Sequence, residues 1–197
     1  MQYPRSPLSA FSLLELLIVT AIIIILMAAA VPAVNSIALG SNLERAGQTV
    51  ADTIGLARQD AVAFNREVQV AFLELPDDSG EKAWRGIQVW RVERSTSGLQ
   101  TNAVTRVLKL PQGMLIAPNT TSPLLTGAPL QGTHTLSNGE NTDFRAFRIS
   151  ANGSLDGITG SNNYVTVQSA LTEEAPPANF YTIQINPVTG KVSSLRP

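Results

Sequence analysis

The feature that most constrains this chain is a long apolar run near its N-terminus. Residues 10–34 read AFSLLELLIVTAIIIILMAAAVPAV, and Glu15 is the only charged residue among them. A helix needs about 20 predominantly apolar residues to span a bilayer, and residues 16–34 come close to this length with only Thr20 and Pro32 as interruptions. A carboxylate at the edge of such a run is costly in hydrocarbon unless it is paired. Glu15 is therefore the first candidate functional residue.

The residues after this run continue a helical pattern. Apolar side chains recur at spacings of three and four, which is typical of one face of an amphipathic helix: Leu39, Leu43, Ala46, Val50, Ile54, Ala57, Ala61 and Phe64. A helix over residues 11–64 is about 80 Å long at 1.5 Å per residue. Gly40, Gly47 and Gly55 weaken it locally, by up to about 1 kcal/mol each relative to alanine. Pro32 lacks a backbone donor, and we expect it to kink this helix rather than end it.

Beyond residue 66 the hydrophobic period changes to two, which indicates strands. Strands are expected over residues 68–75, 87–92, 104–110, 114–117, 144–149, 164–168, 180–186 and 191–195. Residues 118–139 are rich in Thr, Ser, Asn, Gly and Pro and predict a long loop, whereas residues 186–190 predict a hairpin turn. A long helix followed by short antiparallel strands predicts an α+β fold, in which the helix packs on an antiparallel sheet.

The composition removes several classes of function. The net charge is -1 with both signs intermixed, so no electrostatic footprint for nucleic acid stands out. The absence of cysteine excludes disulfides and thiolate metal sites. His134 lies in a polar segment with no acid or nucleophile nearby, and no hydrolase or phosphate-binding motif occurs. Residues 77–81 lack the ligand spacing of an EF-hand and predict a solvated turn. We therefore expect no enzymatic activity, metal or cofactor.

Hydropathy alone does not distinguish between two interpretations of the N-terminal run. In the first it is a secretory signal peptide, with Arg5 as the positive region, residues 16–27 as the apolar core and residues 28–30 as the cleavage site. The mature chain would then begin near Val31. In the second, a short polar leader ends at the small residue Ala10. The helical stripe through Phe64 favours the second, because a cleaved signal does not predict that continuity.

The string FSLLELLIV resembles the N-terminal motif of type IV pilins and type II secretion pseudopilins. Phe11 matches the first mature residue of that superfamily, Glu15 its acidic fifth residue and Pro32 its helix-kinking proline. Ala10 departs from the pattern, because the family carries glycine there. The string LARQDAVAFNREVQVAF, with FRISANGSLDG and INPVTGKVSSL, resembles minor pseudopilin H and FimT-like proteins. The arrangement also resembles the prepilin-like Verru_Chthon cassette protein D family. Residues 76–141 match nothing recognisable.

This resemblance implies a domain organisation and a function. Residues 1–10 are then a leader, 11–34 a transmembrane or filament-core segment, 35–65 an amphipathic helix and 66–197 a β-rich, pilin-like domain. A prepilin peptidase is expected to cleave between Ala10 and Phe11, and Phe11 is expected to be N-methylated. Glu15 is expected to contact a neighbouring pilin or pseudopilin subunit during assembly. The implied location is the bacterial inner membrane, with the domain on the periplasmic side, and afterwards a periplasmic or extracellular filament.

One alternative within the family is a minor pilin that binds DNA for uptake. The candidate residues are a loose basic group in the middle of the chain: Arg85, Arg91, Arg94, Arg106 and Lys109. Acidic residues are interspersed among them, which weakens the attraction to phosphate. Nucleic acid is therefore kept as an alternative partner rather than the expected one.

Overall fold

A computed structural model describes residues 12–96, 98–118, 120–158, 160, 162–171 and 178–196, with the side chains of residues 29–38 left out. The chain divides into two compact units, Met1–Leu39 and Gly40–Pro197. Helix α1 (Leu13–Phe64) begins in the first unit and ends in the second. The long helix expected from the sequence is thus confirmed, and it continues through Pro32 rather than ending there. Among the described residues, no helix has both the length and the apolar character needed to cross a membrane.

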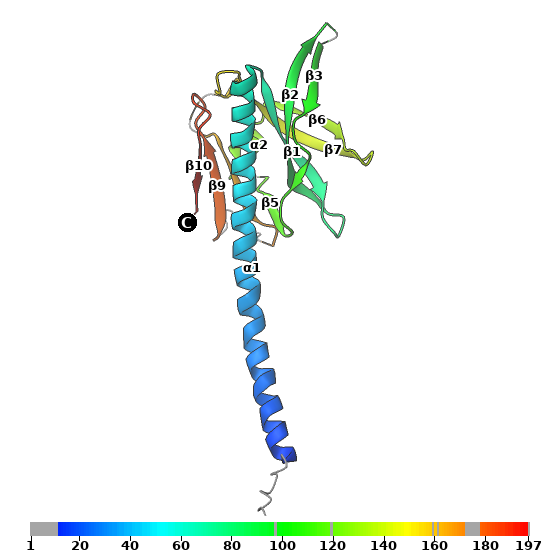
Figure 1. The fold of residues 1–197 in the computed structure, drawn as a ribbon, viewed down its shortest axis with the longest axis vertical. Helices are drawn as coiled ribbons and strands as arrows, with labels where there is room; N and C mark the ends of the chain where they lie inside the picture. The colour runs from blue at the N-terminus through cyan, green and yellow to red at the C-terminus, as the bar shows by residue number, and fades with distance from the viewer. Residues whose placement is uncertain are drawn as a thin grey trace, which may run out of the picture. The chain divides into compact units, whose positions relative to one another are not determined.

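The second unit contains two antiparallel sheets and the C-terminal part of α1 (Figure 1). The first sheet has the order β3-β2-β1-β7-β6, with the short β4 also paired to β2. The second has the order β10-β9-β8-β5. The strands are β1 (Val68–Pro76), β2 (Lys82–Ser95), β3 (Gly98–Ala103), β4 (Leu108–Lys109), β5 (Met114–Ile116), β6 (Leu130–Thr135), β7 (Asn141–Ile149), β8 (Tyr164–Ser169), β9 (Phe180–Ile185) and β10 (Val192–Leu195), and a short helix α2 (Pro123–Thr126) precedes β6.

The C-terminal part of α1 packs against both sheets in one core. Its buried face consists mainly of small and β-branched residues, which allow the strands to approach closely: Leu43, Ala46, Val50, Ile54, Ala57 and Ala61. Opposite them lie apolar side chains of the first sheet, such as Phe72 and Phe147, and of the second, such as Val167 and Ile183. The predicted amphipathic stripe is therefore confirmed from Leu43 to Ala61 as the face that joins the two sheets, whereas Leu39 and Phe64 at its ends are exposed.

Gly47 permits a close approach of α1 to the second sheet. A Cβ atom built at this position would lie 2.2 Å from Cδ1 of Tyr181, so the ring occupies the space where a side chain would be. Gly55, two turns further along the same helix, has no atom within 4 Å of its Cβ position. Both glycines lower the stability of an isolated helix equally. In this fold, however, only Gly47 makes room for a neighbouring side chain.

A second apolar cluster lies on the face of the first sheet that is turned away from α1. It contains Ala71, Leu73, Leu75, Trp90 and Ala146, with Val107, Leu130, Leu136 and Phe144 packed at its margin. This two-sided burial explains why β1 is almost continuously apolar rather than strictly alternating. The alternation of apolar and polar residues is therefore imperfect in β1 because side chains on both of its faces are buried.

The sequence prediction of the β-domain was right for most strands and wrong in three places. Residues 118–139 do not form one long loop, because they include α2 and β6. The strand expected over residues 104–110 is reduced to β4, and β3 lies just before it. One sheet was expected and two are present, since the turn at Gly113, with φ of 77°, leads from β4 in the first sheet to β5 in the second. The hairpin of β9 and β10 is confirmed.

Candidate functional site

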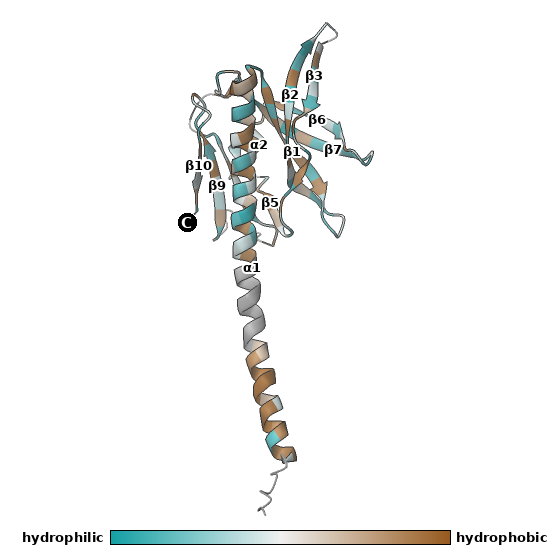
Figure 2. Cartoon of the chain, in the orientation of Figure 1, coloured by the Kyte–Doolittle hydropathy of each residue, from teal (hydrophilic) through white to brown (hydrophobic). Residues whose placement is uncertain are grey.

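The described N-terminal part of α1 has an apolar surface on all of its sides. Every large apolar residue from Leu13 to Met27 is exposed, with fractions from 45% at Ile23 to 83% at Leu13. Figure 2 shows this part of the helix as predominantly hydrophobic, in contrast to the mixed pattern further along α1. A helix that is apolar all round is a buried helix in most proteins. This surface is the first candidate site, and its chemistry is that of a lipid or helix contact.

Glu15 has a local role at the start of this helix. Its backbone N–H donates to the Ser12 hydroxyl oxygen over 3.1 Å, and the Leu16 N–H donates to the Ser12 carbonyl oxygen over 3.2 Å. Ser12 is therefore the N-cap and Glu15 the third helical residue, which is the spacing of a capping box. A carboxylate in the first turn is also favoured by the helix dipole. The side chain itself is exposed and so is available to a partner.

The other sequence-predicted site residues are only partly covered by the structure. Ala10 and Phe11, the expected cleavage and methylation positions, lie outside the described residues, as does Arg5. Pro32 lies in a helical stretch of which only the backbone is described, and the kink expected there stays a prediction.

The C-terminal end of α1 is closed by a Schellman motif. The Asn65 N–H donates to the Val62 carbonyl over 3.4 Å, and the Arg66 N–H donates to the Ala61 carbonyl over 3.1 Å. Asn65 has φ of 50°, the left-handed conformation that this motif requires. Asparagine tolerates this conformation better than most residues. The Asn-Arg dipeptide within the string LARQDAVAFNREVQVAF is therefore the point at which the helix ends, shortly before β1.

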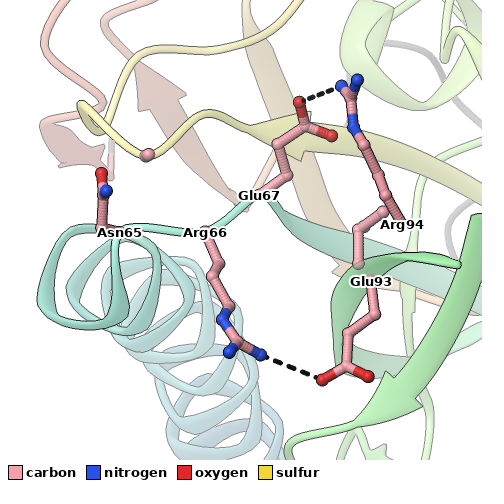
Figure 3. A pocket seen from close by; sticks show the side chains of 7 residues that line it. Asn65, Arg66, Glu67, Glu93 and Arg94 are labelled. Atoms are coloured by element: carbon pink, nitrogen blue, oxygen red, sulfur yellow. Dashed lines mark hydrogen bonds and ion pairs between the residues drawn. The ribbon is translucent and has the colours of Figure 1, made fainter.

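A pocket of about 580 Å³ lies beside this helix end (Figure 3). Two ion pairs cross it, from Arg66 to Glu93 and from Arg94 to Glu67, each with an N–O distance of 3.0 Å. Both arginines are more than half exposed, so each pair contributes at most about 1 kcal/mol to stability. Among the described residues that line the pocket, every charged side chain is thus paired with one of opposite charge.

This pocket is a feature that sequence reasoning missed. A signal was present, since an Arg-Glu dipeptide enters β1 and a Glu-Arg dipeptide lies towards the end of β2. The antiparallel pairing of β1 with β2 brings such dipeptides together with opposite charges facing each other. The register could not be inferred without knowing the irregularity between Leu73 and Glu74.

A partly buried ion pair anchors α1 to the first sheet. Arg91 of β2 donates to both oxygens of Asp60, over 2.7 Å and 3.2 Å, and its guanidinium lies 4.5 Å from the Phe64 ring centroid. The hydrogen bonds to Asp60 raise the pKa of Arg91 above its usual value. Planar, two-point pairing of this kind fixes orientation as well as distance.

These pairings bear on the nucleic-acid alternative. Arg91 is bound to Asp60, Arg94 to Glu67, and Arg85 to Asp77 over 3.0 Å. Phosphate binding through these side chains would have to displace a carboxylate in each case. Of the basic group proposed from the sequence, Arg106 and Lys109 are the exposed members without an ion pair among the described residues. The arrangement does not favour a DNA-binding surface.

The predicted turn at residues 77–81 is confirmed and is organised around one carboxylate. Asp77 accepts hydrogen bonds from the backbone N–H and hydroxyl of Ser79 and from the Glu81 N–H, and it pairs with Arg85. These bonds, with that of the Ser79 hydroxyl the largest, lower the pKa of Asp77 to about 2. The protein itself therefore supplies the partners of this carboxylate.

His134 belongs to an aromatic group rather than to a catalytic arrangement. Its ring centroid is 4.7 Å from that of Trp90, which in turn meets Phe144 edge-on at 5.1 Å. Partial burial lowers the pKa of His134, so the ring is favoured in its neutral form. Among the described residues, no cluster of three histidine or acidic side chains could hold a metal ion.

The fold is thus an α+β domain on a long helix whose other end exposes an apolar surface. No protein-family model and no curated protein sequence matches the chain. Among solved structures, it is similar to the minor pseudopilin EpsH from the Type 2 Secretion System of Vibrio cholerae. The TM-score is 0.43 and the sequence identity 10%, over 79% of this chain and 98% of that one. A likeness this distant assigns no function.

Proposed function

We propose that this chain is a minor pilin or pseudopilin, a structural subunit of a type IV pilus-like or type II secretion filament. The observation that carries the proposal is the apolar surface of residues 13–27 on a helix whose C-terminal part is built into a folded domain. Such a surface is stable only where it is covered on all sides, by acyl chains or by other helices. A bundle of like helices with domains at its periphery satisfies both parts of the chain.

The proposed pathway begins in the bacterial inner membrane. The apolar run of residues 10–34 holds the chain there, with the domain on the periplasmic side. A prepilin peptidase removes the leader after Ala10, Phe11 is methylated, and the subunit leaves the lipid for a periplasmic or extracellular filament. Its partners are other pilin or pseudopilin subunits, and it has no catalytic role of its own. The FSLLELLIV motif supports these steps.

Glu15 is proposed to guide the transfer from lipid to filament. Removal of the leader exposes an ammonium group on Phe11, and this cation pairs with the Glu15 carboxylate of a neighbouring subunit. Each charge is costly in hydrocarbon when alone, and the pair is less so. Pro32 is proposed to bend the helix, which would let neighbouring helices pack around the freed carbonyl.

Mass spectrometry of the mature N-terminus tests the processing step. The chain is expressed with a prepilin peptidase, and the expected first residue is Phe11 carrying one additional methyl group. The matched variant Ala10→Gly restores the residue typical of the family and should increase the processed fraction. A first residue near Val31 would identify a signal peptide and overturn the proposal.

An assembly assay tests Glu15. In cells that contain the cognate filament machinery, Glu15→Gln is expected to reduce the subunit recovered in sheared filaments by at least tenfold. It keeps the size of the side chain and removes only the charge. Thr20→Val is the control in the same run, because the Thr20 hydroxyl donates to the Leu17 carbonyl within its own helix. Equal recovery of Glu15→Gln and the unmodified chain would remove the role proposed for the carboxylate.

A further inference from the structure

Strand β3 is an open edge of the first sheet. It pairs with β2 on one side and stands at the end of the strand order. All six of its residues are exposed, including Leu99 at 53%. The pairing of β1 ends at Arg91 of β2, whereas β3 pairs with β2 as far as Ser95. The hairpin of β2 and β3 therefore extends beyond β1, as Figure 1 also shows.

The pairing register determines which backbone groups of β3 point outward. The Val104 N–H donates to the Val89 carbonyl over 2.8 Å, immediately beyond the pair of Trp90 with Ala103. Hydrogen-bonded and non-hydrogen-bonded pairs alternate along an antiparallel ladder. Asn102 and Gln100 therefore direct their backbone groups to β2. Residues 99, 101 and 103 direct theirs away from the sheet.

Strand β3 itself contains none of the residue types that usually prevent an edge strand from pairing with another chain. Natural edge strands are protected by charged side chains, proline, bulges or a covering segment. The sequence of β3 is GLQTNA, without charge or proline. The opposite edge strand, β6, differs because Leu130 and His134 are half-buried against the domain. β6, with the sequence LQGTHT, is uncharged as well, so the difference lies in exposure, and β3 is the more exposed of the two edge strands of this sheet.

We propose that β3 pairs antiparallel with β3 of a second copy of this chain, around a two-fold axis at Thr101. In this register the outward backbone groups of Leu99 meet those of Ala103 of the second copy, and Thr101 meets Thr101. All facing side chains are neutral, so no like charges oppose each other, and a Thr–Thr pair is a favourable cross-strand contact. The contact is isologous and closes after two copies. It joins two sheets into one and does not depend on the proposed filament role.

Single-cysteine variants test the proposed register of β3 against β3 of the second copy. Because the chain has no natural cysteine, any disulfide must form through the introduced residue. In the full chain in non-ionic detergent, Thr101→Cys should form a disulfide-linked dimer on mild oxidation. Directly opposed, hydrogen-bonded residues have Cα atoms about 5.5 Å apart, which a disulfide can span. Leu99→Cys is the matched control, because its two copies would be about 14 Å apart along the strands. It should cross-link at least tenfold less.

A mixture of Leu99→Cys with Ala103→Cys should form the heterologous disulfide that Leu99→Cys alone does not. Equal cross-linking of Thr101→Cys and Leu99→Cys would indicate random collision or association through another surface, and would overturn the proposal. Absence of a cross-link in every variant would overturn it as well.

Substitutions at Thr101 test the energetic basis by light scattering. Thr101→Pro removes an outward N–H from each copy, and Thr101→Lys keeps the N–H but places two like charges across the axis. Each should raise the dimer dissociation constant at least tenfold, whereas Thr101→Val should leave it within a factor of three. Thr101→Lys keeps the test valid if proline disturbs the hairpin. A dissociation constant unchanged by Thr101→Lys would contradict the pairing.

Discussion

The two ends of α1 differ in what they do with apolar side chains. In residues 13–27 large side chains such as Ile24 are exposed, at 67% in that case. In the second unit the same helix buries a stripe of smaller residues, among them Ala46 and Ile54, which have no exposed surface. One end thus exposes its apolar side chains, whereas the other buries them within the chain.

The charged residues of α1 follow the same division. In the second unit Asp60 pairs with Arg91, Glu44 pairs with Arg196 over 2.8 Å, and Arg58 donates to the Thr189 carbonyl over 2.7 Å. Glu15 has no ion-pair partner among the described residues. One helix therefore combines a half whose side chains are satisfied within the chain with a half whose apolar side chains and carboxylate are exposed. Substitutions of one residue type at both ends separate these two halves.

The largest expected contrast is between two isoleucine truncations. Ile54→Ala removes a fully buried side chain between the sheets and should lower the free energy of unfolding of the domain by about 2–5 kcal/mol. Ile24→Ala removes an exposed side chain and should change it by less than about 0.5 kcal/mol. Urea denaturation in detergent, followed by the fluorescence of the buried Trp84 and Trp90, measures both. Equal losses would mean that the two ends are not energetically distinct.

The second contrast uses two glycines of the C-terminal part. Gly47→Ala should destabilise the domain by about 1–3 kcal/mol, because the new methyl group overlaps the Tyr181 ring. Gly55→Ala should instead stabilise it by about 0.5–1 kcal/mol, because its Cβ position is open and alanine favours the helix. The same denaturation assay gives the sign of each change. A stabilising Gly47→Ala would show that α1 is not held against the second sheet at this point.

The third test concerns the ion pair that anchors α1 to β2. Asp60→Asn leaves the Arg91 guanidinium with a weaker acceptor in a partly buried position and should cost about 1 kcal/mol, because partial exposure reduces the effect. Glu44→Gln is the control, since the Glu44–Arg196 pair is more than a third exposed on both sides and should contribute less. Urea midpoints measure both costs, and high salt should reduce the cost of Glu44→Gln by a larger fraction than that of Asp60→Asn, because the more exposed pair is screened more strongly.

Helix α1 and its buried stripe could be predicted because burial imposes a period on the sequence. Leu43, Val50 and Ile54 repeat at helical spacing for that reason, and β9 and β10 were found through their alternation and their turn. β3 and β6 were missed for the opposite reason. β3 is exposed on both faces, so nothing constrains its side chains to alternate. The residue types of GLQTNA and LQGTHT are those of a loop.

The candidate site was predictable only where it depends on local chemistry. Ser12 and Glu15 have the spacing of a capping box, and Asn65 is a residue type that often ends helices. Both ends of α1 can therefore be recognised from local sequence. The pocket between Arg66 and Glu93 depends instead on the register of β1 against β2. Such long-range pairing has no local signature.

The smallest expected effect is an acid-dependent one in the turn between β1 and β2. Because the folded-state pKa of Asp77 is about 2, below its usual 3.8, the ionised carboxylate stabilises the fold above pH 4. This stabilisation is lost as the pH falls from 4 towards 2. Asp77→Asn should therefore weaken the pH dependence of the urea midpoint in that window. Ser79→Ala, which keeps the charge and removes the strongest hydrogen bond to it, should weaken it less. A pH dependence unchanged in both variants would show that the acid-sensitive group lies elsewhere.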